Sequence, residues 1–402
     1  MLRLYDTLSR TKRPFRPLKG NTVRIYTCGP SVYSYSHIGN FRTYLFEDVL
    51  VRYLRFKEYR VKRVMNVTDV EDKAIAAARR EGVTLAALQR DKARAFFAAF
   101  YYLGMLKPDV VAKASDHVPE MVRMIGRICR NGYCIRDRGG VYFNVRKFRR
   151  YGKLSRLGCR YYFGRARGDD YAKEGLWDFI LWKRWTRGDG NARWRSPFGD
   201  GRPGWHIECS AMSARYLGKT FDIHCGGTDN IYPHHENEIA QSYAANGKPP
   251  ANFWLHARHL TVNRKKMSKR TGNVLYVRQL AEGDIHPKCL RYYLISERYR
   301  HQLDFSWNEF RKRTRGCEQA ARLMAGLRKA EGKGSGRAIA AGLLEGFEGA
   351  MDDDLNTKLA FRRIFRAVRE TERLQRAGKL SRSGAKAICG AMERINGVLG
   401  VF

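Results

Sequence analysis

Four side chains of types that bind zinc stand far apart in the sequence, and two of them share a helical spacing. Cys28 follows a predicted strand, Cys209 ends the run Gly-Trp-His-Ile-Glu-Cys, and His234 and Glu238 lie in Pro-His-His-Glu-Asn-Glu. Residues four apart project from one face of a helix, so His234 and Glu238 can bind a single ion. Zinc accepts thiolate, imidazole and carboxylate ligands. The four residues predict a zinc site suited to recognising a thiol.

Spacing alone leaves two alternatives open at this site. His235 precedes Glu238 by three residues and is placed as well as His234. Scattered cysteines and histidines are less diagnostic than a paired Cys-x-x-Cys site. The same residues could therefore form a buried polar cluster that holds no metal.

The run His37-Ile38-Gly39-Asn40 stands where a strand is predicted to give way to a helix. Backbone amides at a helix N-terminus attract anions, Gly39 allows close approach, and His37 can donate a hydrogen bond to a phosphate. Taken alone, a His-x-Gly run is most often only a turn. The motif indicates a triphosphate site when it is joined to a second signal.

That second signal is the run Lys266-Met267-Ser268-Lys269-Arg270. It places two lysines and a third cation on one predicted loop. Cations on a mobile loop can neutralise the charge that develops as pyrophosphate leaves a nucleotide. A solvated basic loop is the alternative, but it leaves the histidine-glycine run unexplained.

The elements predicted around these residues alternate between strand and helix. We expect strands at 22–27 and 59–67, and helices that begin near 37 and at 71. Such alternation is typical of parallel βαβ units in a doubly wound sheet. Ligands of these sheets gather beyond the carboxyl ends of the strands, which is where Cys28 and Thr68 would lie.

The pattern changes in the middle of the chain and again near its end. A helix near 119–130, followed by a hairpin of 133–136 and 141–145, predicts an insertion between two halves of the sheet. The α/β pattern resumes with a strand at 220–224. After residue 311 the chain is predicted to be helical, with a flexible link at 332–336.

Composition bounds the class of protein. The 402 residues suffice for two or three domains, and 44% hydrophobic residues fit a globular chain. No apolar run is long enough for a membrane span, and the N-terminus lacks a secretory signal. Nine irregularly spaced cysteines do not predict a disulfide framework. We therefore expect a cytoplasmic protein without membrane contact.

Net charge is the unusual quantity, because 77 Lys+Arg against 39 Asp+Glu give +38. Such an excess predicts a polyanionic partner. The densest basic segment, 146–167, interleaves cations with aromatic residues that can stack on bases or pack beneath the charges. A solvated basic face is the alternative for this one segment, whereas the excess along the whole chain favours RNA.

Taken together, these runs resemble the class I aminoacyl-tRNA synthetases and, more narrowly, the cysteinyl-tRNA synthetase family. The resemblance extends over nearly the whole chain. It is carried by 26–30, 66–69, 178–183, 201–210, 222–227 and 233–241, besides the two phosphate motifs. It implies a Rossmann-like doubly wound parallel sheet with an inserted connective domain, followed by an all-α helical bundle.

The resemblance also implies roles for individual residues. One zinc per chain would be held by Cys28, Cys209, His234 and Glu238, and would select the thiolate of cysteine over the hydroxyl of serine. ATP with Mg²⁺ would be bound by His37, Gly39, Asn40, Lys266, Ser268 and Lys269, of which His37, Asn40, Lys266 and Lys269 would be catalytic. The amino acid would contact Gly29, Thr68, Trp205 and Asp229. The implied partners are L-cysteine, ATP and tRNA-Cys, and the implied enzyme is a monomer.

Three departures from the family pattern affect these expectations. Asn40 replaces the second histidine of the HIGH motif, and Arg270 replaces the last serine of KMSKS. An asparagine amide still donates a hydrogen bond, so an altered rate is expected rather than a loss. The chain is also expected to lack the small C-terminal anticodon-binding domain.

The expected domain boundaries follow from the same resemblance. Segments 1–108 and 201–262 form the two halves of the catalytic domain, 109–200 the connective insertion, 263–312 the KMSKS-loop region, and 313–402 the bundle. Two other functions fit part of the pattern. A cysteine:amino-sugar ligase of mycothiol synthesis keeps the zinc and adenylation motifs but gives no reason for the charge. A non-catalytic RNA-binding paralogue is favoured only by Asn40 and Arg270.

Overall fold

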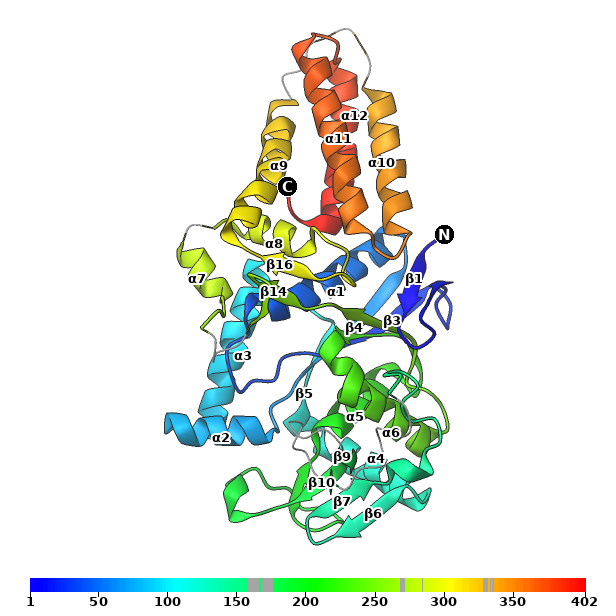
Figure 1. Ribbon diagram of the computed structural model, residues 1–402. Helices are drawn as coiled ribbons and strands as arrows, with labels where there is room; N and C mark the ends of the chain where they lie inside the picture. The colour runs from blue at the N-terminus through cyan, green and yellow to red at the C-terminus, as the bar shows by residue number, and fades with distance from the viewer. Residues whose placement is uncertain are drawn as a thin grey trace.

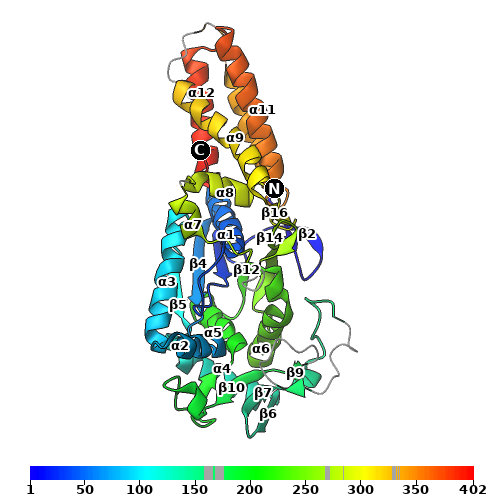
Figure 2. The ribbon, with the colours of Figure 1, turned by 60° about the vertical axis from the view of Figure 1, so that its left-hand side comes forward.

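The computed structural model describes residues 1–157, 166–167, 176–267, 272–283, 285–327, 332, 334 and 336–402. A helical bundle forms one end of the molecule, a parallel sheet lies in the middle, and a smaller antiparallel sheet lies at the opposite end (Figures 1 and 2). None of the helices among these residues combines the length and the apolar character that a membrane crossing needs.

The central sheet has five parallel strands in the order β13-β12-β3-β4-β5. They are β3 (Thr22–Thr27), β4 (Arg60–Val67), β5 (Val110–Lys113), β12 (Phe221–Gly227) and β13 (Ala251–Ala257). The predicted doubly wound fold is confirmed. The direction of winding reverses between β3 and β12, and ligands of such sheets bind beyond the carboxyl ends of the strands at that point.

Helices cover both faces of this sheet. Ile25 and Met65 pack with helix α1 (Ile38–Phe56) on one face. Tyr26 and Val64, their neighbours in sequence, pack on the other face with α4 (Val118–Arg130), α5 (Trp205–Leu217) and α6 (Glu236–Asn246). Because successive strand residues point to opposite faces, the same strands contribute to two separate cores.

Strand β4 continues into two helices before the edge strand β5. They are α2 (Asp72–Glu81) and α3 (Leu85–Tyr102). The Thr84 side chain caps α3 by accepting a hydrogen bond from the amide of Ala87. The helix predicted to begin at 71 is confirmed as α2. Helix α2 lies on the side of the molecule that carries β5 (Figure 1).

The inserted region contains the second sheet, with strand order β11-β10-β7-β6 and antiparallel pairing. Its strands are β6 (Cys134–Asp137), β7 (Gly140–Phe143), β10 (Ile180–Arg184) and β11 (Gly201–Pro203). The predicted hairpin is therefore confirmed. Two short strands, β8 (Ala166–Arg167) and β9 (Leu176–Asp178), pair separately.

The structure places two short strands differently from the expected domain boundaries. β5 belongs to the central sheet although it falls within 109–200, and β11 belongs to the inserted sheet although it falls within 201–262. Strands of three or four residues are too short for a periodic pattern, so only their pairing reveals which sheet they join.

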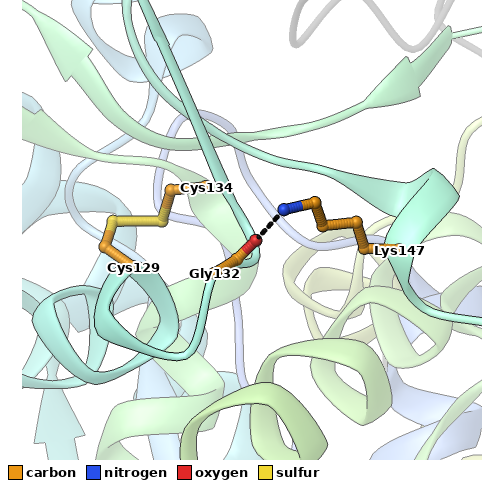
Figure 3. Close-up of a disulfide and its surroundings, with 4 residues drawn as sticks. All are labelled: Cys129, Gly132, Cys134 and Lys147. Atoms are coloured by element: carbon orange, nitrogen blue, oxygen red, sulfur yellow. Dashed lines mark hydrogen bonds between the residues drawn. A yellow bond between two sulfur atoms is a disulfide. The ribbon is translucent and has the colours of Figure 1, made fainter.

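One disulfide closes the turn between α4 and β6. Cys129 and Cys134 are bonded, and Lys147 donates a hydrogen bond of 2.8 Å to the Gly132 carbonyl between them (Figure 3). Five other cysteines of the described residues are free thiols: Cys28, Cys209, Cys225, Cys289 and Cys317. One disulfide between residues five positions apart does not form a disulfide framework among the described residues.

The C-terminal half is mainly helical, as predicted. It contains α7 (Val277–Glu282), α8 (Pro287–Ile295), α9 (Trp307–Gly326), α10 (Arg337–Met351), α11 (Thr357–Arg376) and α12 (Arg382–Leu399). A small sheet, β15-β14-β16, precedes the bundle and comprises β14 (Leu260–Val262), β15 (Lys265–Lys266) and β16 (Leu303–Phe305). The hairpin of β1 (Arg3–Asp6) and β2 (Thr11–Pro14) lies near the base of the bundle (Figure 1). The flexible link predicted at 332–336 lies partly outside the described residues.

A buried ion pair joins helix α1 to α8, which is in turn hydrogen-bonded to α12 of the bundle. Asp48 accepts hydrogen bonds from Arg291 at 2.5 Å and Arg52 at 2.7 Å, and Arg291 also donates to the Leu399 carbonyl at 2.6 Å. Burial raises the pKa of Asp48, but Arg291 and Arg52 outweigh it, so the pKa lies below its usual range. Asp48 is thus held as a carboxylate.

The Asp48→Asn variant is expected to unfold more easily, by about 3–5 kcal/mol at neutral pH, because Arg291 would be left buried without its counter-ion. A carboxylate with a lowered pKa stabilises the fold above its unfolded-state pKa of about 3.9, and this stabilisation is lost as pH falls through the folded-state pKa. In urea unfolding, the gap between wild type and variant should therefore narrow below about pH 4.

Glu393→Gln, an exposed change on α12, provides the control and should leave the unfolding midpoint unchanged. A gap between wild type and Asp48→Asn that stays constant at every pH would contradict the role given to this ion pair.

Candidate active site and metal centre

A cavity of about 730 Å³ opens at the carboxyl edge of the central sheet. It is bounded by the residues after β3 and β4, the first turn of α1, helix α2 and the N-terminus of α5. Its wall includes Cys28, Gly29, His37, Asn40, Thr68, Trp205, Cys209, Asp229 and His234. One cavity thus brings together residues from the metal, phosphate and amino-acid sets.

The four predicted zinc ligands converge on one point beside this cavity. The donor atoms of Cys28, Cys209, His234 and Glu238 all lie within 4.8 Å of one another. Cys28 directly follows β3, Cys209 lies on α5, His234 lies in the segment before α6, and Glu238 lies in the first turn of α6. The His234 Nε2 atom lies 3.1 Å from Glu238 Oε1. Two sulfurs, one imidazole nitrogen and one carboxylate oxygen form a donor set that suits zinc.

A second, overlapping group shares two of these residues. Cys28 and Glu238 also lie within 4.8 Å of His224 and His235. His235 Nε2 lies 3.3 Å from the Cys28 sulfur and its Nδ1 lies 2.8 Å from His256, while His224 Nε2 lies 2.9 Å from Glu238 Oε2. Cys28, Cys209 and His234 line the cavity, whereas His224 and His235 do not. Only the first group could place an ion against a bound molecule.

The ionisation of the first group suits a cation. Burial raises the pKa of Cys209, but a hydrogen bond from Cys28 and the nearby His234 lower it to about 6. The hydrogen bond to Cys209 and burial raise the pKa of the Cys28 thiol. Burial lowers the pKa of His234, but Cys209 and Glu238 outweigh it and raise the pKa to about 10. At neutral pH Cys209 is therefore a thiolate beside a His234 imidazolium, and His234 would release its proton on binding zinc.

Glu238 completes this arrangement as an anion. Burial raises its pKa, but His224 and His234 outweigh burial and lower it to about 2. Its Oε1 atom is fully buried and faces the His234 Nε2 atom, 3.1 Å away. Behind His234 lies His206, whose Nδ1 is 2.9 Å from His234 Nδ1 and whose pKa is lowered by burial and by His234. A buried carboxylate oxygen beside an imidazole that a second histidine holds in place is an arrangement that suits a metal site.

His37 and Asn40 form the start of helix α1. The Asn40 amide donates to His37 Nδ1 at 3.3 Å, and the His37 amide donates to Asn40 Oδ1 at 3.0 Å. This reciprocal pair is a capping box, which satisfies two backbone donors of the first turn. Asn40, the departure from the HIGH motif, thus has a structural role that a sequence motif does not reveal.

Gly39 lets a second segment approach this turn closely. A Cβ atom at Gly39 would lie 2.4 Å from the terminal carbon of Met267, which is buried. The Ile38 amide also donates a hydrogen bond to the Leu275 carbonyl at 2.9 Å, and the backbones of His37 and Tyr276 form an isolated antiparallel β-bridge. Residues on both sides of the 268–271 segment are therefore held against the start of α1.

The lysines of the second phosphate motif lie at the edge of the described residues. Lys266 ends β15, which pairs with β14 in the register Thr261↔Lys266. Ser268, Lys269 and Arg270 lie outside the described residues, and so does Thr271. Met267, the last described residue before this gap, lines the cavity.

The four residues predicted to contact the amino acid all line the cavity. The Gly29 amide donates to Asn66 Oδ1 at 2.8 Å, and Asn66 donates to the Thr68 hydroxyl at 3.1 Å. The Trp205 ring stacks on His234 with centroids 4.3 Å apart. Asp229 is exposed in a short turn, Thr228–Asn230. Trp205 therefore has a defined place beside the proposed ligands.

Sequence reasoning missed several residues of this cavity. Asn66 orients both Gly29 and Thr68, and its position at the end of a buried strand could have indicated this. Tyr33, Tyr44, Lys73, Arg80 and Tyr276 also line the wall. These residues come from four different elements, so no sequence spacing relates them.

The basic and aromatic segment is only partly described. Within 146–157 the cations Arg146, Lys147, Arg149 and Arg150 are exposed, while Phe148 is buried. Phe148 packs near Tyr243, with ring centroids 5.7 Å apart. The ring thus packs beneath the charges, which was one of the two alternatives, and residues 158–165 lie outside the described residues.

Comparisons with known proteins agree with this fold and site. Residues 14–315 match the family model for the class I tRNA synthetase (C) catalytic domain, and residues 346–402 match the DALR domain. Methionyl-tRNA synthetase of Mycobacterium tuberculosis, solved with methionyl-adenylate, has a TM-score of 0.72 at 17% identity, covering 95% of this chain and 92% of that one. At this identity the likeness shows the fold alone. Fold and site together define a class I aminoacyl-tRNA synthetase.

Sequence relatives narrow the class. The cysteine–tRNA ligase of Brachyspira hyodysenteriae is 40% identical over 409 residues, covering 99% of this chain and 86% of that protein. The enzymes of Geobacter sulfurreducens and Stutzerimonas stutzeri are 41% and 42% identical, each covering the whole of this chain and 85% of the relative. The chain belongs to the cysteine–tRNA ligase family.

One expectation from the sequence is wrong. The anticodon-binding part was expected to be missing, but residues 346–402 match the DALR domain. The matched residues comprise the last turns of α10 and the whole of α11 and α12. The amphipathic stripe of Phe361, Ile364 and Val368 predicted a bundle helix correctly. An apolar stripe of this kind predicts that a helix packs against others, but it does not indicate which RNA-binding domain the helices form.

Proposed function

We propose that this chain activates L-cysteine with ATP to cysteinyl-adenylate and transfers the cysteinyl group to the 3′ end of tRNA-Cys. The observation that supports it best is the group of Cys28, Cys209, His234 and Glu238, whose donors meet at the wall of the same cavity as the start of α1. A metal beside a phosphate site suits an enzyme that recognises a thiol while it activates a carboxylate. In the same proposal the reaction takes place in the cytoplasm, on a single chain.

In this proposal Cys28, Cys209, His234 and Glu238 hold one zinc ion, with His206 supporting His234 from behind. When bound, zinc supplies a soft Lewis acid that favours the thiolate of cysteine over the hydroxyl of serine. The chain's own contribution is to keep Cys209 deprotonated and to exclude water from Cys209, His234 and Glu238, which are almost fully buried. His235, which lies behind the cavity wall, belongs to the supporting layer.

The amino-acid pocket in this proposal consists of Gly29, Thr68, Trp205 and Asp229. Asn66 fixes Gly29 and Thr68 relative to each other, because it accepts from one and donates to the other. Asp229 is an exposed carboxylate at the cavity wall and would pair with the ammonium group of the substrate. These contacts would orient the substrate carboxylate toward the nucleotide.

The nucleotide site in this proposal lies at the start of α1. His37, Gly39 and Asn40 would contact the triphosphate of ATP-Mg²⁺, and Lys266, Ser268 and Lys269 would approach from the facing segment. The cysteine carboxylate attacks the α-phosphorus, and pyrophosphate leaves with its bridging oxygen. The cations would stabilise the charge on the transferring group as the bond to pyrophosphate breaks. The terminal ribose hydroxyl of the tRNA then attacks the adenylate carbonyl and releases AMP.

Asn40 offers a test that separates capping from phosphate binding. Asn40→Ala should lower kcat/KM for ATP by roughly 10-fold or more, because a hydrogen bond to a charged group contributes about 1.5–3 kcal/mol. Asn40→Asp keeps an oxygen that can accept from the His37 amide but brings a negative charge to the triphosphate. It should therefore be slower than Asn40→Ala in cysteine-dependent ATP–pyrophosphate exchange. An Asn40→Asp enzyme as fast as wild type would mean that Asn40 only caps the helix.

The function itself is tested by exchange and charging. Purified chain should catalyse ATP–pyrophosphate exchange with cysteine at least about 10⁴-fold more efficiently than with serine, since a site built to bind one polar group strongly rejects an analogue lacking it. It should also charge a tRNA-Cys transcript. Exchange without charging, but with transfer to an amino-sugar, would favour the mycothiol ligase. Binding of RNA without any exchange would favour the non-catalytic paralogue.

We also propose a domain division adjusted to the sheets. The catalytic domain comprises two segments that flank the insertion, and it includes β5. The insertion includes β11. The segment near 263–312 links the nucleotide site to the bundle that follows it.

A further inference from the structure

A second, smaller hollow lies in the inserted sheet, outside the cavity described above. Its volume is about 230 Å³, which is below the roughly 300 Å³ at which pockets begin to hold drug-sized ligands. Tyr142, Ile180 and Trp185 form apolar parts of its wall. A hollow of this size with aromatic walls suits one flat ring system.

Three cations surround this hollow: Arg138, Lys183 and Arg184. Strand pairing brings them together, because Lys183 is opposite Gly140 and the Arg184 amide donates to the Gly139 carbonyl at 2.9 Å. Arg138 and Arg184 are exposed, and neither guanidinium has an acidic partner in the described part of the chain. Two unpaired positive charges thus stand at the rim of an apolar hollow.

The Trp185 ring is held in place before any ligand arrives. Its indole N–H donates to the Gly190 carbonyl at 3.0 Å, and the Arg193 guanidinium lies over the ring at 4.9 Å from the centroid. Arg193 is itself paired with Asp200. A ring fixed by neighbours loses little conformational freedom on binding, which favours stacking.

Helix α2 lies between the hollow and the active-site cavity and contacts residues of both. Lys183 pairs with Asp72 at 2.8 Å, and Arg202 also pairs with Asp72. The following residue, Lys73, lines the large cavity, as does Arg80 near the end of the same helix. The first residues of α2 therefore separate the two spaces, with cations on both sides.

We propose that this hollow binds an unpaired nucleotide of the tRNA, with its base stacked on Trp185 and its phosphates held by Arg138 and Arg184. The inference rests on the proposed tRNA charging and adds to it a binding site for single-stranded RNA outside the catalytic cavity. Stacking on an aromatic ring combined with backbone cations is how proteins bind single strands. An acidic peptide would satisfy the cations but has no flat ring to fill the apolar part.

The central test is a cycle of two changes, one in the protein and one in the RNA. The affinity of a tRNA-Cys transcript is compared with that of the same transcript lacking its unpaired 3′ nucleotides, for wild type and for Trp185→Ala. We expect Trp185→Ala to weaken binding of the complete transcript by roughly 5- to 100-fold, the range for loss of one stacked base. Binding of the shortened transcript should be the same for both proteins. Trp185→Phe, which keeps an aromatic face, should retain most of the affinity.

Matched charge controls separate a local site from the general positive field. The double variant Arg138→Gln/Arg184→Gln should behave like Trp185→Ala. The double variant Arg130→Gln/Arg146→Gln removes two exposed charges of the same inserted region and should reduce the affinity of both transcripts alike. Equal losses for both transcripts with Trp185→Ala, or no loss, would overturn the proposal. The proposal would also be overturned if a polyaspartate peptide displaced the RNA and if Trp185→Ala weakened binding of the peptide as much as binding of the RNA.

Two further measurements keep this inference apart from the function on which it rests. Cysteine-dependent ATP–pyrophosphate exchange should be unchanged in Trp185→Ala, since no tRNA takes part in that step. If wild type shows no exchange, the proposed function fails; if exchange is intact and the cycle shows no coupling, only the hollow's assignment fails. If millimolar AMP bound at Trp185 without competing with tRNA, a free mononucleotide would be the occupant. That result would overturn the RNA assignment.

Discussion

Replacing Cys209 by alanine is expected to remove bound zinc and to lower cysteine-dependent ATP–pyrophosphate exchange by more than about 100-fold. Loss of a group that only supports a metal ligand typically costs 10- to 100-fold, so loss of a ligand should cost more. The pKa of Cys209 is lowered to about 6, so Cys209→Ala removes the sulfur ligand that is already deprotonated at neutral pH. Zinc content by elemental analysis and the exchange rate are the two measurements.

Cys225 provides a control of the same residue type. It is fully buried on β12, like Cys209 on α5, but belongs to neither group of converging donors. Cys225→Ala should therefore keep one zinc per chain and most of the exchange activity. Circular dichroism of both variants checks that they are folded. A Cys209→Ala protein that retains a full equivalent of zinc would remove the basis of the metal assignment.

Gly29→Ala is expected to lower kcat/KM for cysteine by about 100-fold or more, since a displacement of 1 Å near a reacting group can cost that much. A Cβ atom at Gly29 would lie 1.7 Å from the backbone oxygen of Asn66 and 2.9 Å from the Met65 side chain. Backbone cannot move aside cheaply, so β3 and β4 must separate where Cys28 and Thr68 enter the cavity. Steady-state exchange kinetics and urea unfolding measure the two consequences.

Gly342→Ala serves as the matched control for this change. Gly342 is exposed in the middle of α10, and a Cβ atom there would meet nothing within 4 Å. Alanine is a better helix former than glycine by about 1 kcal/mol, so the control should be as active as wild type and slightly more stable. If both variants were equally active, close packing at Gly29 would have no part in shaping the site.

Much of the fold follows from local patterns that a sequence displays. The strand predicted at 22–27 is β3 to the residue, and the stripe of Phe361, Ile364 and Val368 lies on helix α11. Both signals are strong because the period of two or of 3.6 residues repeats along a long element. Short strands such as β5 and β11 give no such repeat, so the sequence does not indicate which sheet they join.

The candidate site divides in the same way between motif and geometry. Motif resemblance alone groups Cys28, Cys209, His234 and Glu238 into one site, although they are as much as 210 positions apart in the chain. It includes Asn66 in a matching run but assigns it no role, although the Asn66 side chain links Gly29 to Thr68, and it does not reveal the capping role of Asn40. Hydrogen bonds between neighbouring strands and within a helix turn depend on orientation, which residue types alone do not encode.

The amino-acid sequence by itself determined the residue types, the family resemblance, the order of strands and helices, and the excess of positive charge. Only the tertiary structure decided that His234 rather than His235 faces the cavity, that Phe148 is buried beneath its cationic neighbours, and that Trp185 lies beside Arg138 and Arg184. The physical reason is that side-chain direction and burial are set by contacts between segments distant in the chain. Adjacent residues such as His234 and His235 have the same chemistry, and packing alone makes them different.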